Sequence, residues 1–188
     1  VLVLIFVREP KTAAPVEREE KPNLIESVKE LFTKENRNAL GIFFGILFWF
    51  IAYNAISAFL SLYGVNYLGL SESDAGRLVT SMSFAFLIFA IPSGIVGGKI
   101  GRKITIMLGL GILIAVLLTM FTMQTGALTQ VLTTLPILGK FMPLSILLMV
   151  AGIGWSFVNI NSLPMVVDLT DASRIGTYTG LYFLFSTL

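Results

Sequence analysis

Long stretches without a charged side chain dominate the sequence. Four of them cover residues 39–63, 78–98, 104–123 and 144–167. A helix needs about 20 apolar residues to cross the roughly 30 Å of hydrocarbon in a bilayer, and each stretch is long enough. Residues 175–188 form a shorter apolar run, which we expect to be a fifth span cut short. The alternating ten-residue segments of a membrane β-barrel do not occur, so the pattern predicts an all-α, polytopic transmembrane helical bundle.

The one long polar stretch covers residues 8–38 and holds seven Lys or Arg and seven Glu residues. Its first half contains three prolines and is typical of a linker. Its second half, NLIESVKELFTKEN, has apolar residues at helical spacing and predicts an amphipathic helix. This helix either lies along the membrane surface or packs against its own bundle. We interpret the apolar residues 1–7 as the end of a preceding transmembrane helix.

The charges of the connecting segments alternate along the chain. Residues 99–103 hold three cations, whereas residues 64–76 hold two acids and residues 124–143 hold a single lysine. Cytoplasmic loops of membrane proteins carry the excess of Lys and Arg. We therefore expect the linker and the loops at 99–103 and 168–175 to be cytoplasmic, and the other two loops to face outside. The expected location is the plasma (inner) membrane.

Composition narrows the class of function. Hydrophobic residues make up 55% of the chain and charged residues 13%, against about 45–50% and 25% in soluble domains. The chain has no His and no Cys, which removes the commonest general base and the commonest metal ligands. The net charge of +2 is too small to indicate a nucleic-acid partner. We therefore expect that the chain is not an enzyme and that it has no catalytic residue, no cofactor and no metal site.

The stretch GIVGGKIGRK, residues 94–103, connects two of the predicted spans. It lacks the first glycine and the hydroxyl of a G-x-x-x-x-G-K-[ST] phosphate loop, which argues against an ATPase. Its cations hold the loop on the cytoplasmic side, and its spaced glycines allow two helices to approach closely. Both of these purely structural roles stay open beside a functional one.

The same stretch is similar to the loop signature G-x-x-x-D-[RK]-x-G-R-[RK] of the major facilitator superfamily. Gly98 stands where that signature has its acid; the matching residues are Gly94, Lys99, Gly101, Arg102 and Lys103. The resemblance implies the second six-helix half of a twelve-helix transporter, from the end of helix 6 to the start of helix 11. We therefore expect the chain to be truncated at both ends, with the N-terminal half as its partner.

A second stretch, DLTDASRIGTYTG at residues 168–180, is similar to the loop between helices 10 and 11 of the same family. It adds Asp168, Asp171 and Arg174 to the candidate gating residues. Arg102 would pair with Asp168 or Asp171 and close the cytoplasmic face when the transporter is open to the outside. The alternative is that the two aspartates cap helix ends.

The candidate solute path is uncharged, because the four complete spans contain no ionisable acid or base. Proton or sodium coupling would then depend on the other half. Neutral polar and aromatic groups lie in the first and fourth spans: Tyr53, Asn54, Ser57, Trp155, Asn159 and Asn161. Asn54 and Ser57 share a helix face, and so do Trp155 and Asn159. Amides beside an indole suit a sugar or another neutral polar solute, and hydrogen bonding between helices is the alternative. The segment NINSLP also resembles the tenth helix of glycoside- or sucrose-type sugar–cation symporters.

These observations predict a secondary active transporter in the lipid bilayer that moves a small solute by alternating access. A proton or a sodium ion is the candidate coupling ion. The alternatives are a fragment of a channel and a membrane scaffold that does not transport. A channel would need a ring of charges or carbonyl groups along a pore, and the sequence has no such ring.

Overall fold

The computed structural model describes residues 24–33, 36–136 and 139–188. The predicted helix end at 1–7 and the proline-containing part of the linker lie outside the described residues. The described elements, in chain order, are α2 (Leu24–Leu31), α3 (Arg37–Leu62), a π-helical turn (Tyr63–Tyr67), α4 (Glu72–Ile100), α5 (Arg102–Thr122), α6 (Thr125–Thr129), β1 (Thr133–Leu135), β2 (Gly139–Phe141), α7 (Pro143–Val167), a 3-10 turn (Ala172–Arg174) and α8 (Ile175–Thr187).

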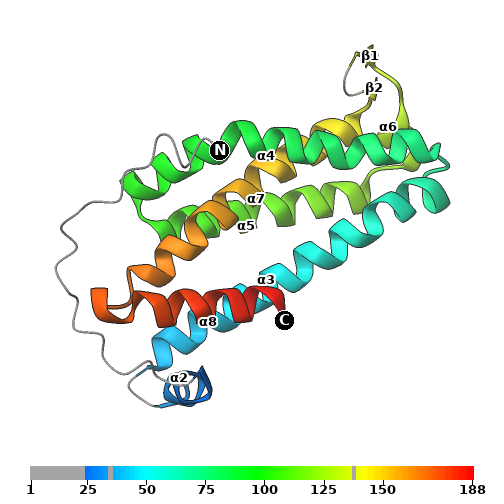
Figure 1. Cartoon of the computed structure of the whole chain (residues 1–188). Helices are drawn as coiled ribbons and strands as arrows, with labels where there is room; N and C mark the ends of the chain where they lie inside the picture. The colour runs from blue at the N-terminus through cyan, green and yellow to red at the C-terminus, as the bar shows by residue number, and fades with distance from the viewer. Residues whose placement is uncertain (1–23, 34–35, 137–138) are drawn as a thin grey trace, which may run out of the picture.

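Four helices of the described chain are long and apolar enough to cross a membrane: Arg37–Tyr67, Glu72–Ile100, Arg102–Thr122 and Pro143–Val167. They cover the four apolar runs of the sequence, and the prediction of an all-α helical membrane fold is confirmed. Figure 1 shows them running along the length of the bundle. We call the end with the α4–α5 and α7–α8 connections the turn end, and the end with β1 and β2 the hairpin end.

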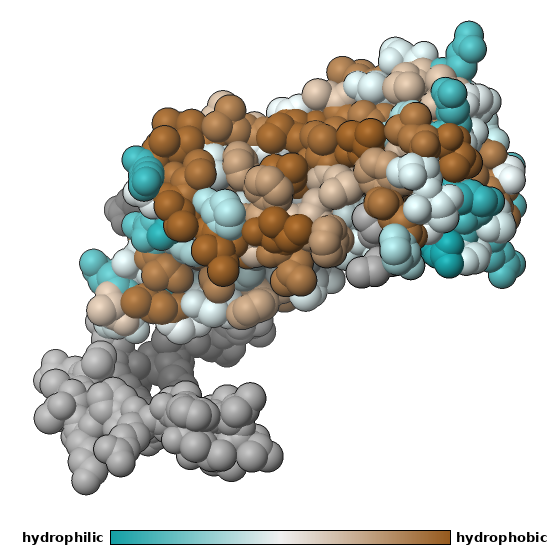
Figure 2. All heavy atoms as spheres, turned by 90° about the horizontal axis from the view of Figure 1, so that it is seen from above, coloured by the Kyte–Doolittle hydropathy of each residue, from teal (hydrophilic) through white to brown (hydrophobic). Residues whose placement is uncertain are grey.

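The surface of the bundle matches a bilayer environment. Figure 2 shows apolar residues along the length of the visible face and hydrophilic residues gathered toward its two ends. Large hydrophobic side chains stay exposed on α4 and α5, among them Ile91, at 77% exposure, and Phe121, at 88%. In water such a surface would be strongly unfavourable, whereas lipid tails cover it at no cost.

Helix α7 forms the centre of the bundle. Half of the most apolar 18-residue segment of α7 is buried, compared with 17–22% of the corresponding segments of the other three long helices. It packs against α4 and α5 at places where only glycine fits. A Cβ atom at Gly152 would lie 2.2 Å from the carbonyl oxygen of Met82, and one at Gly109 would lie 2.5 Å from that of Gly154. The small residues therefore set the close approach of the three helices.

Helix α4 begins six residues before the apolar run that predicted it. The hydroxyl of Ser71 accepts a hydrogen bond from the backbone N–H of Asp74 at 3.1 Å and caps the helix. Glu72 and Asp74 lie in its first turn, where acids interact favourably with the helix dipole. The helix thus extends beyond the charge-free segment because its polar N-terminal turn is stabilised by capping.

A short antiparallel hairpin occupies the connection between α5 and α7, where the sequence pattern indicated only a loop. Thr133 pairs with Phe141, Thr134 with Lys140 and Leu135 with Gly139. Strands of three residues are too short to show a period-two pattern, so the sequence did not reveal them.

Helix α2 packs against the bundle through Leu31, which is 2% exposed and lies in a cluster with Phe43, Tyr178 and Leu181. This contact corresponds to the second of the two placements considered for the amphipathic helix. The neighbouring Phe32 is 61% exposed, so contact of this side chain with the membrane surface stays a prediction.

Candidate functional site

Arg102 and Asp168 form an ion pair at the turn end. Arg102 is the first residue of α5 and Asp168 follows the last residue of α7. The Nε of Arg102 donates a hydrogen bond of 2.8 Å to Oδ2 of Asp168. The two side chains are 29% and 63% exposed, so water screens their attraction. Of the two partners that the sequence left open, Arg102 contacts Asp168, whereas Asp171 is exposed and makes no capping hydrogen bond.

Gly101 makes the tight connection between α4 and α5 possible. Its φ of 96° and ψ of 140° lie in a region that residues with a side chain rarely adopt. It therefore brings Arg102 directly to the end of α7. Lys99 and Lys103 are exposed and form no ion pair with the described residues, and a Cβ atom at Gly94 would lie 3.5 Å from the side chain of Ile160 in α7.

Arg174 pairs with a residue of the linker helix. Its guanidinium donates a hydrogen bond to Glu30 of α2 and lies 5.8 Å from the centre of the Tyr178 ring. The sequence placed Arg174 in the cytoplasmic charge network but gave no sign of this partner. The contact ties the linker to the start of α8.

Asn161 lies in the interface between α4 and α7 and not on an open path. Its side chain is fully buried, and Nδ2 donates hydrogen bonds to the backbone oxygens of Ser93, at 3.1 Å, and Phe157, at 3.0 Å. Its Oδ1 faces Gly97, where a Cβ atom would lie only 1.7 Å away. This placement corresponds to the alternative considered for Asn161, hydrogen bonding between helices.

A pair of serines beside Asn161 was not foreseen. The hydroxyls of Ser93 and Ser156 lie 2.5 Å apart, and both side chains are fully buried between α4 and α7. Small hydroxyl residues inside apolar runs are the sequence signal for such a contact, but the runs contain several and the pairing depends on the packing.

Tyr53 and Trp155, both predicted for the solute path, lie against each other. Their rings are stacked with centroids 3.7 Å apart and planes 4° from parallel. Phe50 meets Trp155 edge to face at 5.3 Å. Trp155 is only 4% exposed, and both stacked rings line a cavity of about 180 Å³ whose other walls are apolar side chains of α3, α4, α5 and α7.

The three other predicted path residues are more accessible. Asn54 is exposed and lines a pocket with Phe185 and Ser186 of α8, while Ser57 and Asn159 are partly buried. The side-chain amides of Asn54 and Asn159 form no hydrogen bond with any described residue. Tyr53 and Trp155 thus bring together the predicted path residues of the first and fourth spans. The side-chain amides of Asn54 and Asn159 remain available for a hydrogen bond to a ligand.

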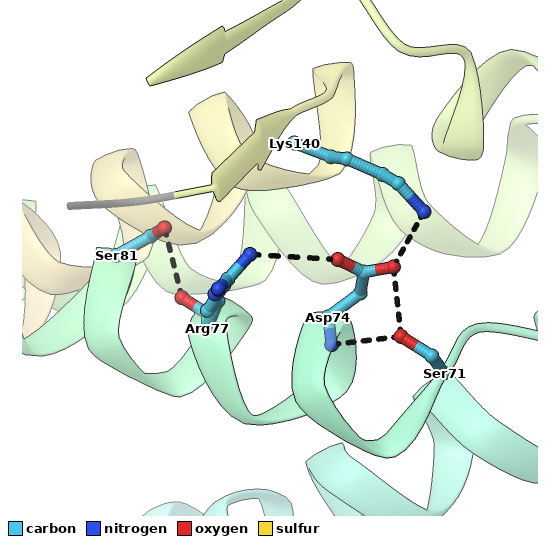
Figure 3. Close-up of polar contacts among 5 residues, drawn as sticks. All are labelled: Ser71, Asp74, Arg77, Ser81 and Lys140. Carbon is cyan, nitrogen blue, oxygen red and sulfur yellow. Dashed lines mark hydrogen bonds and ion pairs between the residues drawn. The ribbon is translucent and has the colours of Figure 1, made fainter. Parts of the chain in front are cut away.

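A second charged cluster, absent from the sequence-based candidates, lies at the hairpin end (Figure 3). Asp74 is 7% exposed, and its Oδ2 accepts hydrogen bonds of 2.8 Å from Lys140 Nζ and from Ser71 Oγ. The Nη1 of Arg77 lies 3.9 Å from Oδ1 of the same carboxylate. A Cβ atom at Gly139 would clash with Arg77 at 2.2 Å, so the hairpin lies directly on this arginine. The cluster ties β2 to the start of α4.

We expect Lys140→Met to lower the free energy of unfolding by about 1 kcal/mol, because the nearly buried carboxylate of Asp74 loses its closest cation while Lys140 itself is half exposed. Thermal unfolding of the purified protein in detergent measures this change. Lys103→Met removes an exposed lysine that has no ion pair within the described chain and should leave the stability unaltered. Equal effects of the two substitutions would contradict the assigned role of the cluster.

Four apolar spans with their charged clusters confined to the two ends define an integral membrane protein. Within the described residues, no group of three or more His, Cys, Asp or Glu side chains is placed to hold a metal ion. The model of the Major Facilitator Superfamily matches residues 1–188, and the chain belongs to this family of transporters. No curated protein and no solved structure matches it.

Proposed function

We propose that this chain is the second six-helix half of a secondary active transporter that moves a small neutral polar solute by alternating access. Family membership supports a transporter, and the loop from Gly94 to Lys103 next to the Arg102–Asp168 pair supports a six-helix half of it. The long polar linker before the first long span supports the placement in the second half. The turn end then faces the cytoplasm, the hairpin end faces outside, and the membrane is the plasma (inner) membrane.

The Arg102–Asp168 pair acts as a gate in this proposal. It joins the start of α5 to the end of α7 and holds the cytoplasmic ends of these helices together while the transporter is open to the outside. A water-exposed pair contributes about 0–1 kcal/mol. Such an energy biases two conformations of similar stability without preventing their exchange. Asp171, Lys99 and Lys103 remain candidates for contacts in the other conformation.

One observation carries the choice of a neutral polar solute. The amides of Asn54 and Asn159 have no partner among the described residues, and they lie on the two helices that the Tyr53–Trp155 stack joins. Free amides donate and accept hydrogen bonds, as the hydroxyls of a sugar require. Because the four spans contain no central charge, the coupling proton or sodium ion of a sugar–cation symporter would bind in the other half.

We expect Asn159→Ala to raise the KM for the transported solute about fivefold, because the substitution removes one hydrogen bond to the solute and such a bond contributes about 1 kcal/mol. Uptake into proteoliposomes by the full-length protein measures this constant, after a thermal-shift screen with sugars and other neutral polar compounds has supplied the solute. Asn66→Ala, at an exposed position in the π-helical turn, is the matched control. An unchanged KM in the Asn159 variant would return this amide to a packing role.

A further inference from the structure

The cavity beside Trp155 continues into a groove between α3 and α5. The cavity has a volume of about 180 Å³ and the groove about 290 Å³. Both are lined by apolar side chains that they share, Ile56, Leu60, Leu117 and Met120. Neither Asn54 nor Asn159 lines either of them. The cavity is therefore distinct from the two amides proposed to bind the solute, and its chemistry suits an apolar occupant.

The groove is open at the surface of the described structure, at the hairpin end. Its mouth contains Phe59 and Phe121, which are 65% and 88% exposed, together with Tyr63. The ring of Tyr63 stacks on Tyr67 with centroids 5.2 Å apart. Tyrosines are enriched at the level of lipid headgroups, where the ring is in apolar surroundings and the hydroxyl reaches water. The Tyr63–Tyr67 pair thus marks the headgroup level at the mouth of the groove.

The depth of the cavity fits half of a bilayer. Tyr53 lies ten residues before Tyr63 along the helix, which corresponds to about 15 Å at 1.5 Å per residue. One leaflet contributes about half of the roughly 30 Å of hydrocarbon. A lipid chain whose headgroup lies beside Tyr63 therefore ends near the Tyr53–Trp155 stack.

We propose that an acyl chain of a membrane phospholipid enters the groove between α3 and α5 and fills the cavity beside Trp155. Apolar cavities of about 150 Å³ stay dry and take up apolar molecules, so water does not compete for this space. The occupant contacts the Tyr53–Trp155 stack from the side of α5 and supports the relative position of α3 and α7. A lipid binding site is thereby placed directly behind two residues of the proposed solute path.

Tryptophan fluorescence tests this proposal directly, because the 188 residues contain only Trp49 and Trp155 and both line the cavity. The full-length protein, with any tryptophan outside these residues changed to Phe, is placed in nanodiscs of phosphatidylcholine brominated at the middle of its acyl chains. Bromine quenches an indole only at close contact. We expect strong quenching, and Ala52→Phe, which fills the cavity from α3, to reduce the quenched fraction at least twofold.

Ala58→Phe is the matched control, because Ala58 is also an exposed alanine of α3 but lines neither space. It should leave the quenching unchanged. Leu117→Phe on α5 narrows the same space from the opposite wall and should act like Ala52→Phe, so the outcome does not depend on the folding of one variant. Weak quenching in the unchanged protein, as when another helix covers the groove, would overturn the proposal. Quenching that neither cavity variant reduces would overturn it as well.

Discussion

Gly97→Ala is expected to lower the free energy of unfolding by about 3 kcal/mol, the upper end of the usual cost of overpacking a well-packed interior. The added methyl group would lie 1.7 Å from Oδ1 of Asn161, which is fully buried. The amide cannot simply rotate away, because its Nδ2 is held by the carbonyl groups of Ser93 and Phe157. Thermal or chemical unfolding of the purified protein measures the loss.

Gly98 provides the control for this experiment on the same helix. A Cβ atom there meets nothing within 4 Å, so Gly98→Ala should be neutral or stabilising by up to about 1 kcal/mol, the helix-propensity difference between the two residues. The double variant Gly97→Ala with Asn161→Ala should be more stable than the sum of its two single changes predicts, because the methyl group at position 97 no longer clashes with the amide of Asn161. Strict additivity would show that Gly97 and Asn161 do not contact each other in the folded protein.

Arg102→Glu is expected to reduce the rate of solute uptake about tenfold in the full-length protein. The substitution replaces an attraction of about 0–1 kcal/mol with a repulsion of similar size, at the contact that joins α5 to α7. If the pair closes the cytoplasmic face, the two conformations become unequally populated and the cycle slows. Initial rates of uptake into proteoliposomes give the effect.

The reversed pair, Arg102→Glu with Asp168→Arg, should recover a large part of the lost rate because the attraction is restored with opposite polarity. Lys29→Glu changes an exposed cation of α2 that forms no ion pair within the described chain and is not a candidate gating residue, and uptake should stay within about twofold of the original. A reversed pair that is as slow as the single variant would show that Asp168 is not the partner through which Arg102 acts.

The glycine at position 98 explains why Arg102 pairs with a residue outside its own loop. In the loop signature of the family an acid stands at that place, and in this chain the position is exposed with open space around it. Arg102 therefore has no acid on its own loop and contacts the end of α7 instead. In the proposed gate, the contact joins two separate connections of the bundle.

The predicted helices show where sequence patterns are informative. A charge-free run of about 20 residues reflects a property of the bilayer, and it identified all four long helices. The same criterion missed the first six residues of α4, because a capped polar turn is helical without being apolar. It also missed the hairpin, whose strands are too short for a periodic pattern.

The residues of the candidate site were predictable from the sequence, but the contacts between them were less so. Arg102 and Asp168 were both recognised as charges at the same end of the bundle, yet the choice between Asp168 and Asp171 needed the structure. The contacts of Asp74 with Lys140 and of Arg102 with Asp168 each join residues 66 positions apart. No local spacing rule reaches over such a distance.

The sequence by itself determined the number of long spans, the family and the division of the chain into apolar interior and charged ends, because each of these follows from local hydropathy or a contiguous motif. Only the tertiary structure decided which polar groups meet. Asn161 became an interhelical contact because Gly97 leaves room for it on α4. Tyr53 and Trp155 became one stack because α3 reaches α7. Partners of this kind depend on the relative placement of whole helices, which packing sets and local sequence does not encode.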